Sequence, residues 1–328
     1  MSDDVPNLNE LLASYPAYNI AGHVRPDGDC VGSAVALSRY LEQLGKRGYI
    51  VRHDTLPANL EYFLAGASSV TLENFDHSLP LICVDCSDHA RIGVQLAETY
   101  GQPFLVIDHH KSNKGFAQTS IIMPHAASTT EVLAKLFEKI GVHLGEKIAE
   151  ALYLGILTDT GRFAYNTSLD TFRYAQLMLQ SGADPNKIYS LVYENDSIQR
   201  YRLLERFLAN IELFSKNRAC ISHLSTADLA EVGGHVGDTE GFVDYTRKLA
   251  GVVIGCYVEF HDDFVKCSMR SVDKHLRLDL LAERLGGGGH ACAVGFTADP
   301  QTFSLDRLKE SIDQHINEFY DEYVAAYK

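Results

Sequence analysis

The chain lacks a long apolar run and a leader-like start. No stretch approaches the roughly 18 consecutive apolar residues that a membrane-spanning helix needs. The first ten residues, MSDDVPNLNE, are acidic and polar, so they lack the basic region and the apolar stretch of a secretory signal. The sequence therefore predicts a protein that is not inserted in a membrane, and it favours the cytoplasm.

The sequence also lacks the cysteine pattern of a disulfide framework. Its seven cysteines are scattered, their number is odd, and most of them lie in apolar runs. This usage favours reduced thiols in a cytosolic protein. Cys83 and Cys86 form a C-x-x-C, but no further thiols or helix start lie beside them, so we interpret them as packing residues.

Basic charge is scarce as well. Lysine and arginine total 29 against 43 aspartates and glutamates, which gives a net charge of −14. Proteins that grip long nucleic acid usually carry a basic stripe. The acidic balance thus argues against a long duplex held by electrostatics alone. It remains compatible with a small phosphate ligand held beside metal ions.

What the sequence does contain is a regular alternation of element types in its first half. Short apolar runs typical of buried strands alternate with segments of helical spacing. The predicted strands cover 18–23, 49–51, 79–85 and 104–108, and the predicted helices cover 31–44, 129–140 and 147–158. Such alternation predicts an α/β domain with a parallel sheet and helices on both faces.

The second half follows a different pattern. Residues 171–213 read as nearly all helical with one break at 182–185, which indicates a helical connector or, alternatively, the last helix pair of the first domain. Beyond it we predict strands at 219–224, 252–260, 264–271 and 291–296, and helices at 278–285 and from about 305. The length favours two domains. We therefore predict a first domain at 1–185, a connector at 186–213 and a smaller α+β domain at 214–328.

Four polar clusters each directly follow an apolar element of the first domain. In α/β proteins this is where the ligand crevice lies. The clusters are His23-Val-Arg-Pro-Asp27-Gly-Asp29, then Asp85, then Asp108-His109-His110, and finally Asp159 at the end of ALYLGILTD. Taken singly, a D-x-D in a loop or an aspartate at a strand end is most often a turn or cap. Their repetition at the mouth of each element indicates one shared site.

Carboxylates and imidazoles in such a site call for metal ions. A buried carboxylate needs a cation or water, and few basic residues lie between the clusters. Mixed imidazole and carboxylate ligands suit Mn, Zn, Fe or Co. The charges of Asp27, Asp29, Asp85 and Asp159 together balance two divalent ions. Two neighbouring metals are a standard arrangement for phosphoester hydrolysis.

A fifth cluster lies in the second domain. Gly286 to Gly289 are consecutive glycines followed by His290, and successive backbone N–H groups of such a run can form an anion-binding nest. Upstream, strand alternation places Lys266, Ser268 and Arg270 on one face, where Arg270 could bind phosphate through two hydrogen bonds. The alternative is a solvated strand face next to a flexible glycine linker.

In this order, the five clusters resemble the DHH phosphoesterase family, in the subgroup that carries a DHH-associated C-terminal domain. The matching motifs are H-x3-D-x-D at 23–29, the strand-end Asp85, D-H-H at 108–110, T-D-T-G at 158–161 and G-G-G-H at 287–290. The resemblance covers about 21–295. It is closest to the short bacterial members that act as nanoRNases and as phosphatases of 3′-phosphoadenosine 5′-phosphate (pAp).

The resemblance implies a role for each motif residue. One metal would be held by His23, Asp27 and Asp85, and the other by Asp29, Asp85, His109 and Asp159, with Asp85 bridging. The catalytic residues would be Asp85, His110, which contacts the scissile phosphate, and Asp108, which orients a histidine. Substrate would be bound by Ser268, Arg270, Gly287, Gly288, Gly289 and His290.

The expected activity is manganese-dependent hydrolysis of short oligonucleotides, of pAp, or of both, with cobalt or magnesium as alternative metals. Metal-activated water would attack the phosphate, and the second domain would bind the far end of the substrate. Hydrolysis of cyclic or linear dinucleotides is the alternative on the same domains, and a nucleotide sensor without catalysis is the alternative of another class. A homodimer is left open.

Overall fold

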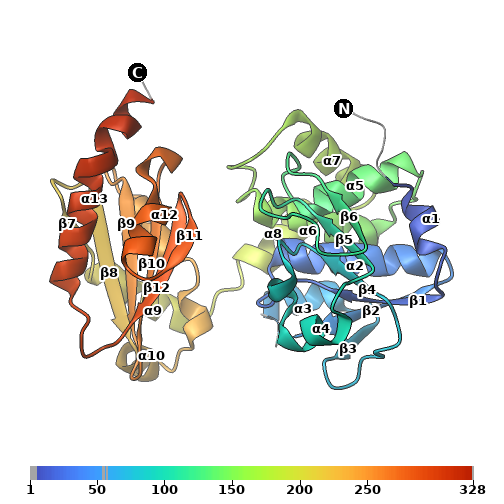
Figure 1. Ribbon diagram of the computed structural model, residues 1–328, viewed down its shortest axis with the longest axis horizontal. Helices are drawn as coiled ribbons and strands as arrows, with labels where there is room; N and C mark the ends of the chain where they lie inside the picture. The colour runs from blue at the N-terminus through green and yellow to red at the C-terminus, as the bar shows by residue number, and fades with distance from the viewer. Residues whose placement is uncertain (1–5, 54–55, 57, 327–328) are drawn as a thin grey trace. The chain divides into compact units, whose positions relative to one another are not determined.

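The computed structural model describes residues 6–326 apart from 54, 55 and 57. The chain divides into two compact units, the first ending at Asn195 and the second beginning at Asp196 (Figure 1). Across the described residues, every helix is too short or too polar to cross a lipid bilayer. Each unit has its own sheet.

The first unit is built on a six-stranded sheet in which all strands run parallel, in the spatial order β3-β2-β1-β4-β5-β6. The strands are β1 (Ala17–Ala21), β2 (Arg47–Arg52), β3 (Ser69–Thr71), β4 (Leu81–Val84), β5 (Leu105–Asp108) and β6 (Thr119–Ile122). After β1, the chain adds β2 and then β3 on one side. It then returns to place β4 on the other side of β1, and adds β5 and β6 beyond it. Parallel sheets bind ligands at this switch point, beyond the carboxyl ends of the two central strands.

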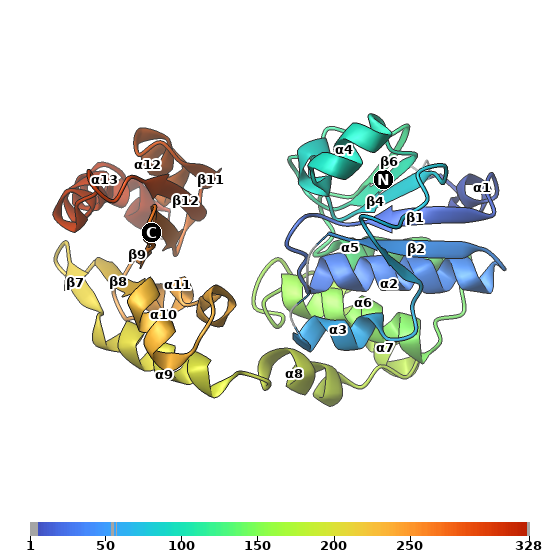
Figure 2. The same ribbon diagram turned by 90° about the horizontal axis from the view of Figure 1, so that it is seen from below.

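Helices cover both faces of this sheet, as predicted (Figure 2). They are α1 (Leu8–Leu12), α2 (Gly28–Gln43), α3 (Ala58–Leu64), α4 (Val94–Tyr100), α5 (Thr129–Lys139), α6 (Glu146–Asp159), α7 (Leu169–Gln180) and α8 (Pro185–Tyr193), with a 3₁₀ turn η1 (His89–Ile92). Ile82 and Ile107 face the larger core with α2, α5 and α6, whereas Cys83 and Val106 face a smaller core with α4. Because neighbouring strand residues point to opposite faces, burial of both faces produces the continuous apolar runs seen in the sequence.

Small residues bring α2 and α6 into close contact. A Cβ on Gly32 would lie 2.3 Å from the carbonyl oxygen of Ala151, and one on Gly28 would lie 2.5 Å from the Thr158 side chain. The two helices can therefore approach closely only with glycine at these positions. This approach carries Asp29, near the start of α2, toward the end of α6.

The second unit has a mostly antiparallel six-stranded sheet, in the order β11-β12-β10-β9-β8-β7, where only β8 and β9 run parallel. Its elements are α9 (Ile198–Ala209), β7 (Glu212–Phe214), β8 (Ala219–Ser225), α10 (Thr226–Val232), η2 (Val236–Thr239), α11 (Val243–Arg247), β9 (Ile254–Phe260), β10 (Val265–Ser271), η3 (Lys274–Leu276), α12 (Leu278–Arg284), β11 (Gly288–His290), β12 (Ala293–Ala298) and α13 (Leu305–Ala325). Helices α12 and α13 pack on one face, and α9 and α11 on the other. This is the smaller α+β domain that the sequence predicts.

The prediction of one nearly continuous helical region at 171–213 is wrong in its details. A second break separates α8 from α9, and the region ends in a strand, β7. The break is stabilised by Ser197, whose side chain accepts a hydrogen bond from the backbone N–H of Arg200 and so caps α9. The division between the two units falls at this break, inside the range predicted as a connector.

The second half of the glycine run is part of the second sheet, so the run is not simply a flexible linker. Gly288–His290 form β11, which pairs with β12. Gly289 has a φ of +142°, and a Cβ there would lie 2.4 Å from the carbonyl oxygen of Ala293. Glycine is therefore required at this position by both backbone conformation and space. The strand predicted at 291–296 is β12, which begins two residues later.

Candidate functional site

The predicted metal ligands converge at the carboxyl edge of the first sheet. Three groups of side chains there could each hold a metal ion, and within each group the candidate ligand atoms lie within 4.8 Å of one another. The groups are His23, Asp27 and Asp85; Asp29, His109 and Asp159; and Asp85, His109 and His110. Because the groups share residues, they form one continuous cluster.

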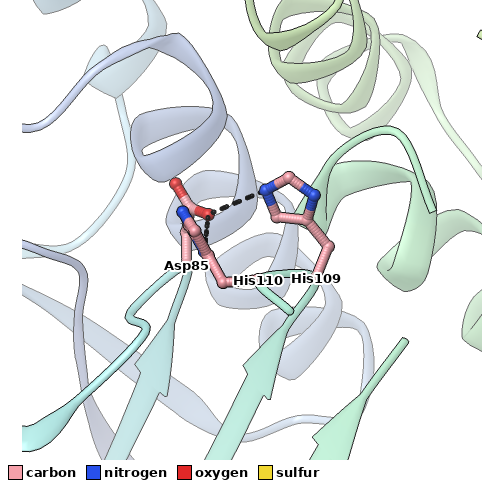
Figure 3. Close-up of side chains that lie close together, drawn as sticks. All are labelled: Asp85, His109 and His110. Atoms are coloured by element: carbon pink, nitrogen blue, oxygen red, sulfur yellow. Dashed lines mark ion pairs between the residues drawn. The ribbon is translucent and has the colours of Figure 1, made fainter. Parts of the chain in front are cut away.

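Asp85 lies between the histidines of this cluster. It directly follows β4, is almost fully buried, and has a left-handed φ of 57°. Its Oδ2 lies 3.5 Å from Nε2 of His23. Its Oδ1 lies 3.7 Å from Nε2 of His109 (Figure 3). The two carboxylate oxygens of Asp85 therefore face different histidines. A strained backbone at such a position is typical of functional sites.

Asp27 and His23 form one side of the cluster. Oδ1 of Asp27 caps α2 by accepting hydrogen bonds from the N–H groups of Asp29 and Cys30, both at 3.0 Å. Its Oδ2 lies 3.8 Å from Nε2 of His23. Nδ1 of His23 donates to the carbonyl of Val24 at 2.9 Å, so Nε2 is the ring nitrogen that faces the carboxylates. This orientation leaves Nε2 available as a ligand atom.

His23 and Asp159 both have raised pKa values, so each favours its protonated form when no metal ion balances the acidic charge of the cluster. Burial alone would lower the pKa of His23, but Asp27 and Asp85 raise it to about 10. Burial raises the pKa of Asp159 to about 6, because it outweighs the opposing effect of His109. Since metal ligands must be deprotonated, a bound cation would displace these protons.

Asp29 is fully buried and is held by the start of α5. Its Oδ2 accepts a hydrogen bond from the Thr129 N–H at 2.6 Å. Its Oδ1 accepts from the Thr130 N–H at 2.9 Å and from the Thr130 hydroxyl at 2.8 Å. Burial, with the charges of Asp85 and Asp159, raises the pKa of Asp29 well above its ordinary value. The helix N-terminus opposes this shift, because its N–H groups favour the charged carboxylate.

Thr129, Thr130 and Gly155 also support the cluster, although the sequence did not indicate them. The Thr129 hydroxyl also donates to Oδ1 of Asp85 at 3.0 Å, so the start of α5 holds two of the predicted ligands. A Cβ on Gly155 would lie 2.4 Å from Oδ1 of Asp29, so glycine leaves the room that this carboxylate needs. The sequence predicts a helix that begins at 129, where α5 begins, but no sequence pattern indicates the contact of this helix with Asp29.

His109 and Asp159 lie on the other side of the cluster. Nε2 of His109 is 3.3 Å from Oδ2 of Asp159, which is the last residue of α6. Nδ1 of His109 lies 3.3 Å from the carbonyl oxygen of Ala126 and donates to it. In both His23 and His109, Nδ1 thus donates to a backbone carbonyl, and Nε2 faces carboxylates.

Asp108 positions His110 and belongs to none of the three groups. It is fully buried, its Oδ1 accepts from Nδ1 of His110 at 2.7 Å, and its Oδ2 accepts from the Asn113 amide at 2.7 Å. The Asp108 bond raises the pKa of His110, although burial opposes this. The raised pKa favours the imidazolium form of His110, which lies at the edge of the cluster and can contact an anionic phosphate. Asn113 is a further contributor that the sequence did not indicate.

Four of the predicted substrate residues share one face of the second sheet, whereas Gly289 alternates to the other face and Gly287 lies before β11. Arg270 and His290 are both paired with Ala293 of β12, from opposite sides, and Ser268 and Gly288 are both paired with Gly295. Directly opposed residues of antiparallel strands point to the same face. The structure therefore brings Ser268, Arg270 and His290 onto one surface, as the alternation of β10 predicts.

Arg270 is partly buried without an acidic partner. Its guanidinium donates to the carbonyl of Met269 at 3.0 Å. Among the described residues no carboxylate lies within 4.0 Å of it, whereas Lys266 on the same strand pairs with Glu259 at 2.6 Å. Burial lowers the pKa of Arg270; the charge of Asp244 opposes this shift, and the charge of Arg247 adds to it. A desolvated guanidinium of this kind favours an anionic ligand.

We expect the Thr129 hydroxyl to support metal binding through its hydrogen bond to Asp85. Thr129→Val removes the bond to Asp85 but keeps the side-chain shape and the N–H bond to Asp29, so we expect manganese affinity to fall roughly 10-fold. Thr129→Ser restores a hydroxyl and should recover most of the loss. Calorimetric titration of each variant with Mn²⁺ measures the affinity directly. Equal affinities for the valine variant and the wild type would show that the hydroxyl does not support the centre.

The fold and the cluster define an α/β protein that can hold divalent metal ions at the carboxyl edge of a parallel sheet. The chain belongs to the DHH family. Residues 18–156 match the N-terminal domain of that family.

Individual relatives align with nearly the whole chain. The bifunctional oligoribonuclease and PAP phosphatase NrnA of Thermus thermophilus is 31% identical over 92% of this chain and 90% of its own length. The cyclic-di-AMP phosphodiesterase GdpP of Geobacillus thermodenitrificans is 25% identical over 96% of this chain but only 49% of its own length. An exopolyphosphatase-related protein from Bacteroides fragilis has the same fold, with a TM-score of 0.85, 23% identity and coverage of 97% of this chain and 98% of its own.

Proposed function

We propose that this protein is a manganese-dependent phosphoesterase that hydrolyses short oligonucleotides, pAp, or both. The chain is a hydrolase of phosphate esters, in line with its family and with the relative from Thermus thermophilus that is named for both activities. The observation that carries the finer proposal is the pair of ligand groups on either side of Asp85. Each group combines carboxylates with an imidazole.

The residues present fit two divalent ions. His23, Asp27 and Asp85 would hold one, and Asp29, Asp85, His109 and Asp159 the other. The four aspartates balance the charge of two such ions, and their mixture with imidazoles suits manganese, with cobalt or magnesium as alternatives. Bound ions would supply Lewis-acid activation of the phosphate and of the attacking water.

The protein's own groups then orient the substrate. His110, fixed by Asp108, contacts the scissile phosphate and offsets its charge. Thr129 and Thr130 keep Asp85 and Asp29 in place. In the second unit, Arg270, Ser268, His290 and the backbone of Gly287–Gly289 bind a phosphate or the terminal nucleotide of the substrate.

The proposal is tested with a substrate panel in the presence of Mn²⁺. The panel contains pAp, RNA from dinucleotides to pentanucleotides, cyclic dinucleotides and a long RNA duplex. We expect turnover of pAp or the short RNAs and none of the duplex, because recognition is local to the site. Turnover of the duplex at the rate of the dinucleotide, or of no panel member, would refute the proposal.

A dinucleotide phosphodiesterase is the second candidate. It is favoured by the alignment of almost the entire chain with a cyclic-di-AMP phosphodiesterase. Preferred turnover of the cyclic arm of the panel would select this function. A sensor without catalysis is disfavoured, because the whole set of proposed ligands is present and gathered. We place the activity in the cytoplasm, since all seven cysteines are free thiols.

A further inference from the structure

Four exposed cations border the metal cluster, and we call them the basic rim: Arg25, Arg91, Lys111 and Lys114. They lie in the segments that follow β1, β4 and β5, with Arg91 in η1, so these segments share the carboxyl edge of the sheet with the ligands. Across the described part of the chain, none of the four forms an ion pair. By contrast, Arg39, Arg52, Lys147, Arg173 and Lys187 of the same unit each pair with a glutamate.

Contacts between the three loops make the rim continuous. The Val24 N–H donates to the carbonyl of Arg91 at 2.8 Å, which places the backbones beside Arg25 and Arg91 together. The Asn113 amide donates to the carbonyl of Cys86 at 2.9 Å, which ties the loop of Lys111 and Lys114 to the end of β4. The rings of His89 and Phe116 meet edge to face with centroids 5.9 Å apart. The segments that carry the four cations are therefore in contact with one another.

The position of the rim in the sequence joins it to the cluster. Arg25 lies between His23 and Asp27, and Lys111 directly follows His110. In a chain with a net charge of −14, cations without acidic partners gathered beside four aspartates are unexpected unless an anion is to be bound there. Lone exposed cations in a row are suited to successive phosphates of a single strand.

We propose that the basic rim binds phosphodiester groups beyond the scissile phosphate, and so favours oligonucleotides longer than a dinucleotide. This inference rests on the proposed function and adds a length preference to it. A dinucleotide has a single internal phosphodiester, and this group would lie at the metal cluster. A pentanucleotide has further phosphodiesters that reach the rim.

The test compares two matched double variants. Arg91→Gln with Lys111→Gln removes two rim cations. Arg47→Gln with Lys135→Gln removes one arginine and one lysine that are also exposed and also without ion pairs among the described residues, but lie at the start of β2 and on α5. The two variants have the same net charge, so a general charge effect cancels.

For the rim variant we expect the ratio of kcat/KM for pentanucleotide to that for dinucleotide to fall roughly 10-fold. The slope of log kcat/KM against log salt for the pentanucleotide should flatten by at most about 0.7 per cation removed. The control variant should keep the wild-type ratio and slope. An unchanged ratio in the rim variant, or equal losses on both substrates, would overturn the inference.

A binding measurement separates this inference from the proposed function. Fluorescence anisotropy of a labelled pentanucleotide, without added metal, reports the rim independently of turnover. Weaker binding by the rim variant alone supports the inference even if hydrolysis of short RNA is not found. Equal binding by the rim variant and the control variant overturns it even if hydrolysis is found.

Discussion

Asp85→Asn is expected to lower turnover by about 1000-fold or more and to weaken the binding of both metal ions. Asp85 lies between the two ligand groups, with one oxygen toward His23 and the other toward His109. Asparagine tolerates the left-handed backbone found at this position, so the loss isolates the carboxylate charge. Turnover of pAp or dinucleotide and calorimetric Mn²⁺ titration measure the two effects.

The matched control for this substitution is Asp88→Asn. Asp88 is exposed, belongs to none of the ligand groups and caps η1, a role that asparagine also fills. It should retain wild-type turnover and metal affinity. If Asp85→Asn kept near-normal hydrolysis with manganese, a shared ligand at this position would be excluded.

Arg270→Ala is expected to lower kcat/KM for pAp or dinucleotide roughly 10- to 100-fold, because a charge-assisted contact with phosphate is lost. A small artificial phosphodiester, bis(p-nitrophenyl) phosphate, has no second phosphate or nucleotide for the second unit to bind, so its hydrolysis should change little. Arg270→Lys keeps the charge but not the two-pronged contact and should recover only part of the loss.

Steady-state kinetics on both substrates distinguish this role from a structural one. A substrate-binding role affects the nucleotide and spares the artificial ester. Equal losses on the two substrates would mean that Arg270 supports the fold or the chemistry in general, and the proposed contact would be withdrawn.

Much of the first unit could be predicted from the sequence because both faces of its central strands are buried. Burial of both faces makes β4 and β5 uninterrupted apolar runs, and each run ends where a polar cluster starts. The positions of Asp85 and Asp108 at strand ends therefore predicted a shared edge. The short edge strands β3 and β6 were not predicted, because three or four half-exposed residues leave no clear periodicity.

Other parts of the site depend on contacts between distant segments. The hold of Thr129 and Thr130 on Asp29 joins residues about one hundred positions apart, and no local pattern encodes it. The need for glycine at 155 follows only from the packing of α6 against that carboxylate. The basic rim likewise could not be predicted from the sequence, because it depends on contacts between loops that are distant in the chain.

Counting the manganese ions bound per chain is the most direct test of the central claim, that remote carboxylates and imidazoles gather around a pair of cations. Equilibrium dialysis of the purified wild-type protein against Mn²⁺ gives this number. We expect two ions per chain at saturation, falling to at most one in Asp85→Asn. A single ion in the wild type, or two ions held unchanged without the Asp85 carboxylate, would contradict the account.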